Sequence, residues 1–139
     1  MAATDAFRKQ HEELLVIAGR LTKLLDPVRL AADAASARIQ LSDLAGKLKV
    51  HLAMEDKGLY PRMIGDTDSS VRDVAKRFVD EMGGIATVFT EYMDRWRSTG
   101  AIQQSPQQFV KETRDLVGAL ASRIDRENTQ LYPLLDRRG

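Results

Sequence analysis

A segment that occurs twice constrains the fold of this chain more than any other feature. Residues 44–61 and 116–133 are identical at seven corresponding positions, each pair 72 residues apart. The matched pairs are Leu44 and Leu116, Gly46 and Gly118, Leu48 and Leu120, Glu55 and Glu127, Leu59 and Leu131, Tyr60 and Tyr132, and Pro61 and Pro133. Such a repeat predicts two related helical hairpins, with the same helix in each half carrying the polar residues.

Polar residues continue the apolar face of each copy. The leucines from Leu41 to Leu48 recur at intervals of three and four residues, which is the spacing of one face of an α-helix. His51 and Glu55 fall next on this face, where burial is costly unless a partner compensates for it. In the second copy Glu127 keeps its place, but Arg123 stands where the first copy has its histidine. A bound cation is one partner that would satisfy such groups.

The hydrophobic periodicity predicts an all-α protein. Apolar stripes at helical spacing indicate four helices, near residues 4–25, 35–60, 70–98 and 106–133. Short connections between helices of this length are typical of an antiparallel up-down-up-down four-helix bundle. A chain of 139 residues is long enough to bury a core, so residues 1–139 are expected to form a single domain.

Capping and breaking residues set the expected ends of these helices. Thr4 is a predicted N-cap, and Ser70 followed by Asp73 resembles a capping box. Pro61 is expected to end or kink the second helix. The adjacent glycines at 83–84 lower the stability of the third helix and indicate close helix packing or a kink.

Composition excludes several classes of protein. The formal net charge is +1, with acids and bases mixed along the chain, so no nucleic-acid partner is expected. No apolar run approaches the roughly 20 residues that cross a bilayer, and no apolar signal core is present, so we expect a cytoplasmic protein without a membrane partner. The chain contains no cysteine. Without a nucleophile motif, a phosphate-binding glycine loop or a cofactor fingerprint, an enzyme is not supported and no catalytic residue is assigned.

The polar stripe residues resemble the pattern of one protein family. The carriers are His11 with Leu14 early in the chain, His51-Leu-Ala-Met-Glu55 running into Leu59-Tyr60-Pro61, and Glu127 running into Leu131-Tyr132-Pro133. In these features, which span essentially the whole chain, the sequence resembles the hemerythrin-like, or HHE cation-binding, domain family. The resemblance implies a four-helix bundle with a non-haem di-iron centre between its helices. Family members bind dioxygen or are linked to sensing of iron, oxygen or nitric oxide.

Two departures from the family pattern affect this implied centre. Carried over by position, the candidate metal ligands are His11, His51, Glu55 and Glu127. The histidine that the family places on the third helix is absent, and Met82 best occupies its position. The histidine of the fourth helix is replaced by Arg123. Because the chain contains only two histidines, the full set of family ligands cannot be built.

Three interpretations of these buried polar residues remain open. An intact di-iron centre is disfavoured, because nitrogen ligands are too few and Arg123 is a permanent cation that would repel a metal. A single iron or other divalent metal held by the four candidate ligands is chemically sensible, since two imidazoles and two carboxylates suit iron, zinc or manganese. The third interpretation, which the sequence favours, is a metal-free core. In it Arg123 pairs with Glu55 or Glu127 and acts as a substitute cation.

Two functional hypotheses follow. In the first, the chain is a non-enzymatic binding or regulatory module, with an unidentified protein partner, that has lost the di-iron centre. In the second, it is a mononuclear metal-binding protein that senses or handles oxygen, nitric oxide, peroxide or iron. The sequence leaves open whether Glu81 or Tyr92 contributes to the core site.

Overall fold

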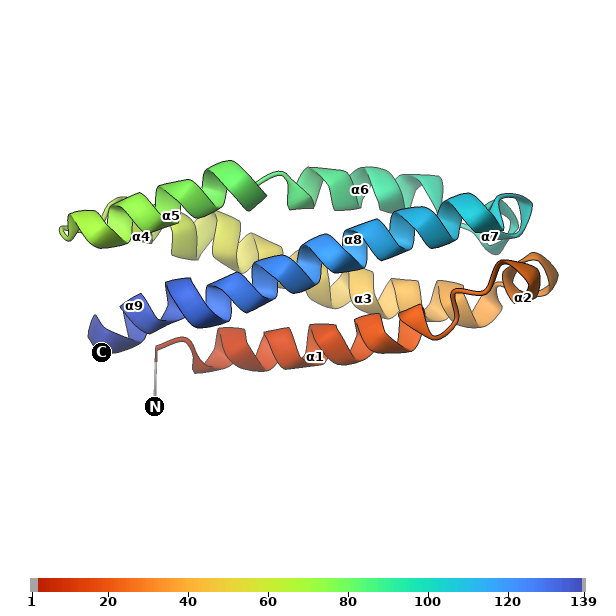
Figure 1. Ribbon diagram of the computed structural model, residues 1–139, viewed down its shortest axis with the longest axis horizontal. Helices are drawn as coiled ribbons and strands as arrows, with labels where there is room; N and C mark the ends of the chain where they lie inside the picture. The colour runs from red at the N-terminus through yellow and green to blue at the C-terminus, as the bar shows by residue number, and fades with distance from the viewer. Residues whose placement is uncertain (1–2, 139) are drawn as a thin grey trace.

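Four antiparallel arms make up the molecule in a computed structural model that describes residues 3–138 (Figure 1). The arms are α1 (Asp5–Thr22); α3 (Ala35–Met54), η1 (Glu55–Leu59) and α4 (Tyr60–Ile64); α5 (Ser69–Met82) and α6 (Ile85–Arg95); and α8 (Pro106–Arg126), η2 (Glu127–Leu131) and α9 (Tyr132–Arg138). The short helices α2 (Pro27–Ala32) and α7 (Thr99–Gln104) lie at the end of the bundle away from the two termini (Figure 1). No strand occurs within residues 3–138, and the predicted all-α bundle is confirmed.

The second and fourth arms pass through their prolines by widening one turn. A proline lacks an N–H group and its ring clashes with the carbonyl four residues earlier, so a regular α-helix cannot accommodate it in its interior. Here η1 precedes Pro61 and η2 precedes Pro133, and both are π-helical turns. The arms therefore continue to residues 64 and 138, so the expectation that the helices end near 60 and 133 was wrong. The repeat found in the sequence is also a repeat of this uncommon backbone geometry.

The third arm is interrupted at its pair of glycines. A Cβ atom at Gly83 would lie 2.5 Å from the carbonyl oxygen of Val79, too close for a side chain, whereas at Gly84 nothing lies within 4 Å. The predicted helix 70–98 is thus two helices, α5 and α6, and α6 ends at Arg95. The break follows Met82 directly.

The predicted N-cap position of the first helix is confirmed, although its side chain makes no capping bond, and the predicted cap at Ser70 was wrong. Thr4 occupies the N-cap position of α1, but its hydroxyl donates to Asp136 of α9 at 2.7 Å instead of capping the helix. Asp68, not Ser70, caps α5: its carboxylate accepts from the backbone N–H of Ser70 at 2.9 Å. Similarly, Asp26 caps α2, and the first helix ends at residue 22 rather than near 25.

Two apolar clusters fill the interior, one on either side of a polar layer. The larger cluster extends toward the α2 and α7 end and includes Leu30 and Ile102. The smaller cluster packs between α4, α5 and α9 around Met63 and Phe78. Fully burying one such side chain stabilises a fold by about 1.5–3 kcal/mol, which helps to offset the cost of burying charge between the clusters.

No helix among the described residues is both long enough and apolar enough to cross a membrane.

Candidate metal centre

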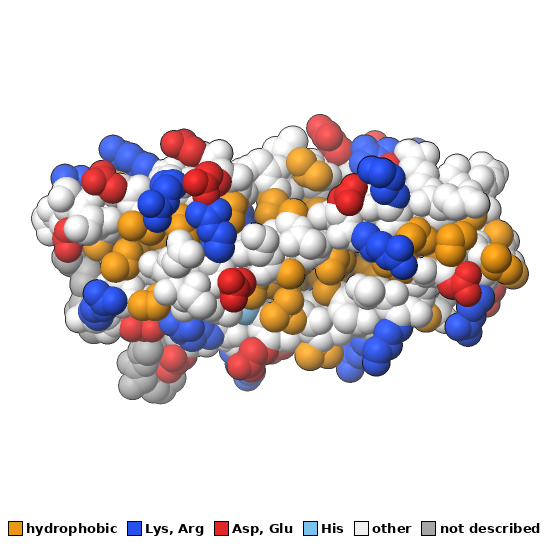
Figure 2. Space-filling model, in the orientation of Figure 1, with side chains coloured by type: hydrophobic (Ala, Val, Ile, Leu, Met, Phe, Trp, Pro, Cys, Tyr) orange, Lys and Arg blue, Asp and Glu red, His pale blue; other side chains and the backbone are white. Residues whose placement is uncertain are grey.

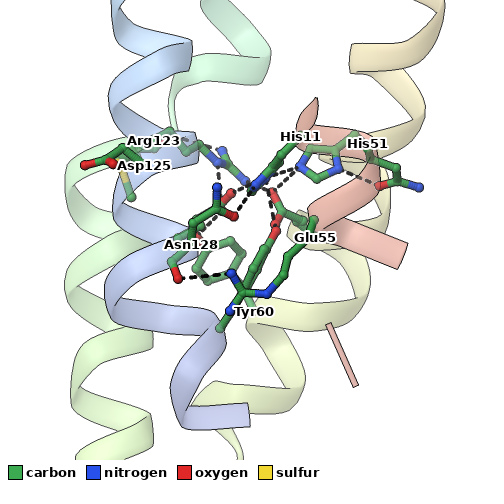
Figure 3. A network of polar contacts seen from close by, with 12 residues as sticks. His11, His51, Glu55, Tyr60, Arg123, Asp125 and Asn128 are labelled. Atoms are coloured by element: carbon green, nitrogen blue, oxygen red, sulfur yellow. Dashed lines mark hydrogen bonds and ion pairs between the residues drawn. The ribbon is translucent and has the colours of Figure 1, made fainter. Parts of the chain in front are cut away.

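Five buried polar side chains meet between the two apolar clusters. They are His11 from α1, His51 from α3, Glu55 from η1, Arg123 from α8 and Glu127 from η2. Each exposes 2% of its surface or less. Figure 3 shows His11, His51 and Glu55 directed toward one another, with Arg123 beside them. In the sequence these residues are polar members of apolar helix faces, and the structure brings all five together. Whether they hold a metal stays a prediction.

Four of the five form a group that we call the donor cage: His11, His51, Glu55 and Glu127. The Nε2 atoms of the two histidines lie 3.0 Å apart. Oε1 of Glu55 lies 2.9 Å from Nε2 of His51, and Oε1 of Glu127 lies 3.0 Å from Nε2 of His11. One donor atom from each residue lies within 4.8 Å of all the others. Nitrogen and oxygen donors from different helices therefore converge on one small volume.

Two amide side chains indicate which ring nitrogen of each histidine faces a hydrogen-bond acceptor. Oδ1 of Asn128 lies 2.8 Å from Nδ1 of His11, and Oε1 of Gln10 lies 2.6 Å from Nδ1 of His51. An amide oxygen only accepts hydrogen bonds, so we assign the ring proton of each histidine to Nδ1. Each Nε2 then directs a lone pair into the cage. Metal-binding histidines are commonly held in this way, by a partner on the other ring nitrogen.

Most of the atoms that converge in the cage lack a hydrogen-bond donor, and the exception is Oε1 of Glu55, which accepts from Arg123. With both ring protons on Nδ1, the two Nε2 lone pairs oppose each other at 3.0 Å. Oε1 of Glu127 is buried and accepts no hydrogen bond from the described residues, although it lies near His11. Buried acceptors without a partner are costly. This arrangement of acceptors would be stabilised by a positive charge placed among them.

Arg123 bridges the two carboxylates of the cage. Its Nε donates to Oε2 of Glu127 at 3.1 Å, and its Nη2 donates to Oε1 of Glu55 at 3.1 Å. Nη2 also donates to Asp56 at 2.9 Å, and Nη1 donates to the backbone carbonyl of Met82 at 3.4 Å. The guanidinium thus contacts both cage glutamates and a third carboxylate.

Each glutamate of the cage is also held by a tyrosine from the other half of the repeat. Tyr60 donates to Oε2 of Glu127 at 2.5 Å, and Tyr132 donates to Oε2 of Glu55. The hydroxyl oxygen of Tyr132 also lies 3.1 Å from Nε2 of His11. Burial and the neighbouring carboxylates raise the pKa of both phenols, so both hydroxyls keep their protons and act as donors.

The two carboxylates differ in their affinity for a proton. Burial by itself would raise the pKa of Glu55, but a protonated His51, which donates a hydrogen bond to it and carries a positive charge, lowers it to about 2 together with the charge of Arg123. For Glu127, burial and the negative charge of Glu55 outweigh the favourable contacts, and its pKa is raised. Glu127 is therefore the carboxylate that takes up a proton more readily when no metal ion is bound.

Sequence reasoning missed three residues that contact the cage or Arg123. Gln10, Asp56 and Asn128 each adjoin a cage residue in the sequence, and this adjacency was the only signal available. Neighbouring residues on a regular helix point in different directions. Only residues on one face of each helix were considered from the sequence, and these three were therefore placed outside the site. Which of them turns inward depends on how the helices pack.

The two residues whose contribution was open lie elsewhere. Glu81 pairs with Arg126 at 2.5 Å on a partly exposed surface. The hydroxyl of Tyr92 makes a 2.6 Å hydrogen bond with the hydroxyl of Thr113, in the larger apolar cluster. Met82 is buried in the smaller cluster, and its backbone carbonyl accepts a hydrogen bond from Arg123.

The sequence matches the model of a known protein family. The model of the hemerythrin HHE cation-binding domain matches residues 2–135, which is nearly the whole chain. Comparisons with curated proteins and with solved structures return no match.

Proposed function

The chain belongs to the hemerythrin HHE cation-binding domain family, and from this premise we propose that it binds a single divalent metal ion in the donor cage. In this proposal the chain has lost the di-iron centre of its family and is a binding or regulatory module, not an enzyme. The observation that carries it is the convergence of two imidazole Nε2 atoms and two carboxylate oxygens, of which Oε1 of Glu127 accepts no hydrogen bond from the described residues.

The spacing of the donor atoms suits one ion. Neighbouring ligands around a six-coordinate ion with bonds of about 2.1 Å are separated by about 3.0 Å. The three closest pairs in the cage are separated by 2.9, 3.0 and 3.0 Å. Mixed imidazole and carboxylate ligands suit iron, manganese and zinc. When bound, iron or manganese would supply redox chemistry toward oxygen, nitric oxide or peroxide, and zinc would supply charge alone.

The charges of the site also favour a dication. Three carboxylates surround one guanidinium, since Arg123 contacts Glu55, Asp56 and Glu127. With neutral histidines, this leaves two negative charges in excess when all three carboxylates are ionised. A single divalent ion would neutralise that excess and remove the strain that otherwise raises the pKa of Glu127.

Arg123 supports the restriction to one ion. By the internal repeat it stands where the second half would otherwise supply the counterpart of His51. Its guanidinium makes ion pairs with both cage glutamates, so it already neutralises part of the charge that a second ion would need. Arginine has no acceptor and cannot lose its proton in a protein, so it cannot act as a ligand.

A metal-free core is the second candidate, and the bridging position of Arg123 favours it. It leaves the two opposed Nε2 lone pairs and Oε1 of Glu127 without a donor, however, unless a proton enters the cage. Because buried acceptors of this kind are costly, the metal-binding form accounts for more of the geometry.

The test is the number of ions bound per chain. Protein purified without chelator is loaded separately with Fe²⁺, Zn²⁺ and Co²⁺, and the bound metal is measured after gel filtration. We expect one ion per chain, lost in His51→Ala and in Glu127→Gln. Glu112→Gln is the matched control, because Glu112 is a hydrogen-bonded carboxylate outside the cage. Two ions per chain would contradict the loss of the di-iron centre, and no binding at all would leave the metal-free core.

A further inference from the structure

The repeated Leu-Tyr-Pro segments place one phenol against each cage glutamate, and the pairing is crossed between the halves. In each half, the backbone N–H of the tyrosine donates to the carbonyl of the glutamate five residues earlier, across the π-helical turn. The side chain of the same tyrosine donates to the glutamate of the other half. Each π-helical turn thus links its own glutamate and the opposite glutamate to one tyrosine.

The two oxygens of each cage glutamate have different partners. Oε2 of Glu127 accepts from Tyr60 and also from Arg123, and Oε2 of Glu55 accepts from Tyr132. The Oε1 atoms are the ones that lie 2.9 and 3.0 Å from the histidine Nε2 atoms. When a hydrogen bond fixes Oε2 of a carboxylate, Oε1 has little freedom to rotate away from the cage.

We propose that Tyr60 and Tyr132 are positioning residues for the metal, which hold Oε2 of each glutamate so that Oε1 is directed at the ion. This inference rests on the proposed metal binding and goes beyond it by assigning a role to residues that bind no metal themselves. A hydrogen bond from a hydroxyl to an ionised carboxylate is strong and directional. Partners that orient a ligand in this way commonly change metal affinity by about 10–100-fold when they are removed.

The bundle contains a matched control for these two residues. Tyr92 is buried to the same degree as Tyr132, and its hydroxyl is also paired with a side chain, that of Thr113. It lies in the larger apolar cluster and makes no contact with a cage carboxylate among those the structure describes. Replacing its hydroxyl removes the same atom from a comparable environment. Such a change tests for general effects of a buried tyrosine on the fold.

The experiment measures the dissociation constant for Co²⁺ and Zn²⁺, by competition with a chelating dye, in the parent, Tyr60→Phe, Tyr132→Phe and Tyr92→Phe. Circular dichroism and a denaturant titration first establish the folded fraction of each variant. We expect Tyr60→Phe and Tyr132→Phe to bind both ions about 10–100-fold more weakly, and Tyr92→Phe to stay within about twofold of the parent. The visible absorption spectrum of bound Co²⁺ should change in the first two variants, because a released carboxylate alters the coordination of the ion.

Affinities of Tyr60→Phe and Tyr132→Phe within about twofold of the parent, with an unchanged Co²⁺ spectrum, would overturn the positioning role while leaving the proposed metal binding intact. A parent that binds neither ion would overturn both. An equal loss of affinity in Tyr92→Phe would show a general effect of tyrosine replacement and would also overturn the inference. If Tyr132→Phe does not fold, Tyr60→Phe decides the outcome, because each tyrosine is predicted to act on one glutamate.

Discussion

The two halves of the molecule share a backbone but differ in the side chains that it carries. In both, a helix widens into a π-helical turn at a glutamate and continues through Leu-Tyr-Pro. At the ligand positions, the first half supplies His11 and His51, whereas the second half supplies Met82 and Arg123. The repeated backbone geometry therefore does not depend on a repeated set of ligands. It follows from the prolines and from the packing of the tyrosines.

The helices that precede these turns differ as well. In the first half, α1 runs without interruption past His11. In the second half, the corresponding arm breaks immediately after Met82, at Gly83. The backbone carbonyl at this break accepts a hydrogen bond from Arg123. The half that lacks histidines is thus also the half whose arm is broken beside the guanidinium.

The largest expected effect is on stability, and it comes from removing the positive charge of Arg123 in the second half. Arg123→Ala should destabilise the metal-free protein by about 3–5 kcal/mol, because it leaves Glu55 and Glu127 buried without their shared partner. The denaturant midpoint measures the loss. Arg126→Ala is the control, since Arg126 pairs with Glu81 on a partly exposed surface and should contribute about 0–1 kcal/mol. Equal midpoints for Arg123→Ala and the parent would show that Arg123 is not a substitute cation.

Replacing Arg123 by histidine, the residue at the matching position of the first half, should raise the metal content. Arg123→His introduces an imidazole one turn before Glu127 and removes a competing cation, so bound metal should rise above one ion per chain. Elemental analysis after loading with Fe²⁺ or Zn²⁺ measures this, with Arg123→Gln as a variant that loses the charge without gaining a ligand. A content that is the same in both variants would indicate that the imidazole does not reach the ion.

A smaller effect on metal binding is expected from removing Asn128, whose side-chain amide lies in the second half and contacts His11 of the first half. Asn128→Ala removes the acceptor that fixes the ring of His11, and metal affinity should fall about 10–100-fold. The adjacent Thr129→Ala is the control, because its exposed hydroxyl donates to the backbone carbonyl of Asp125, in its own arm. The dissociation constant for Zn²⁺ is the measurement. Equal affinities in the two variants would contradict the assignment of the ring proton.

The smallest effects concern the break in the third arm. Gly83→Ala should destabilise the protein by about 1–3 kcal/mol, because the new Cβ would lie 2.5 Å from the carbonyl oxygen of Val79. Gly84→Ala should stabilise it by about 0.4–1 kcal/mol, since the site is open and alanine restricts the unfolded chain. Thermal unfolding of the two variants compares them directly. The same shift in both would mean that the arm adjusts freely at this point.

Several features were determined by the sequence alone. The spacing of apolar residues predicted the helical bundle, because amphipathic helices must bury one face. The same spacing placed His11, His51, Glu55, Arg123 and Glu127 on inward faces, and the structure brings these residues together. The offset of 72 residues predicted the two related halves. These conclusions needed only local periodicity and the relation between the two copies.

Other features were decided by the tertiary structure. The crossed hydrogen bonds from Tyr60 and Tyr132, and the contact of Arg123 with Asp56, join residues that are distant in the sequence. They depend on how each helix is rotated about its axis and on the extra residue in each π-helical turn, which no single-helix pattern specifies. Thr4 illustrates the same point at a helix end, because its hydroxyl bonds to Asp136, a residue that only the packing of the two chain ends brings near.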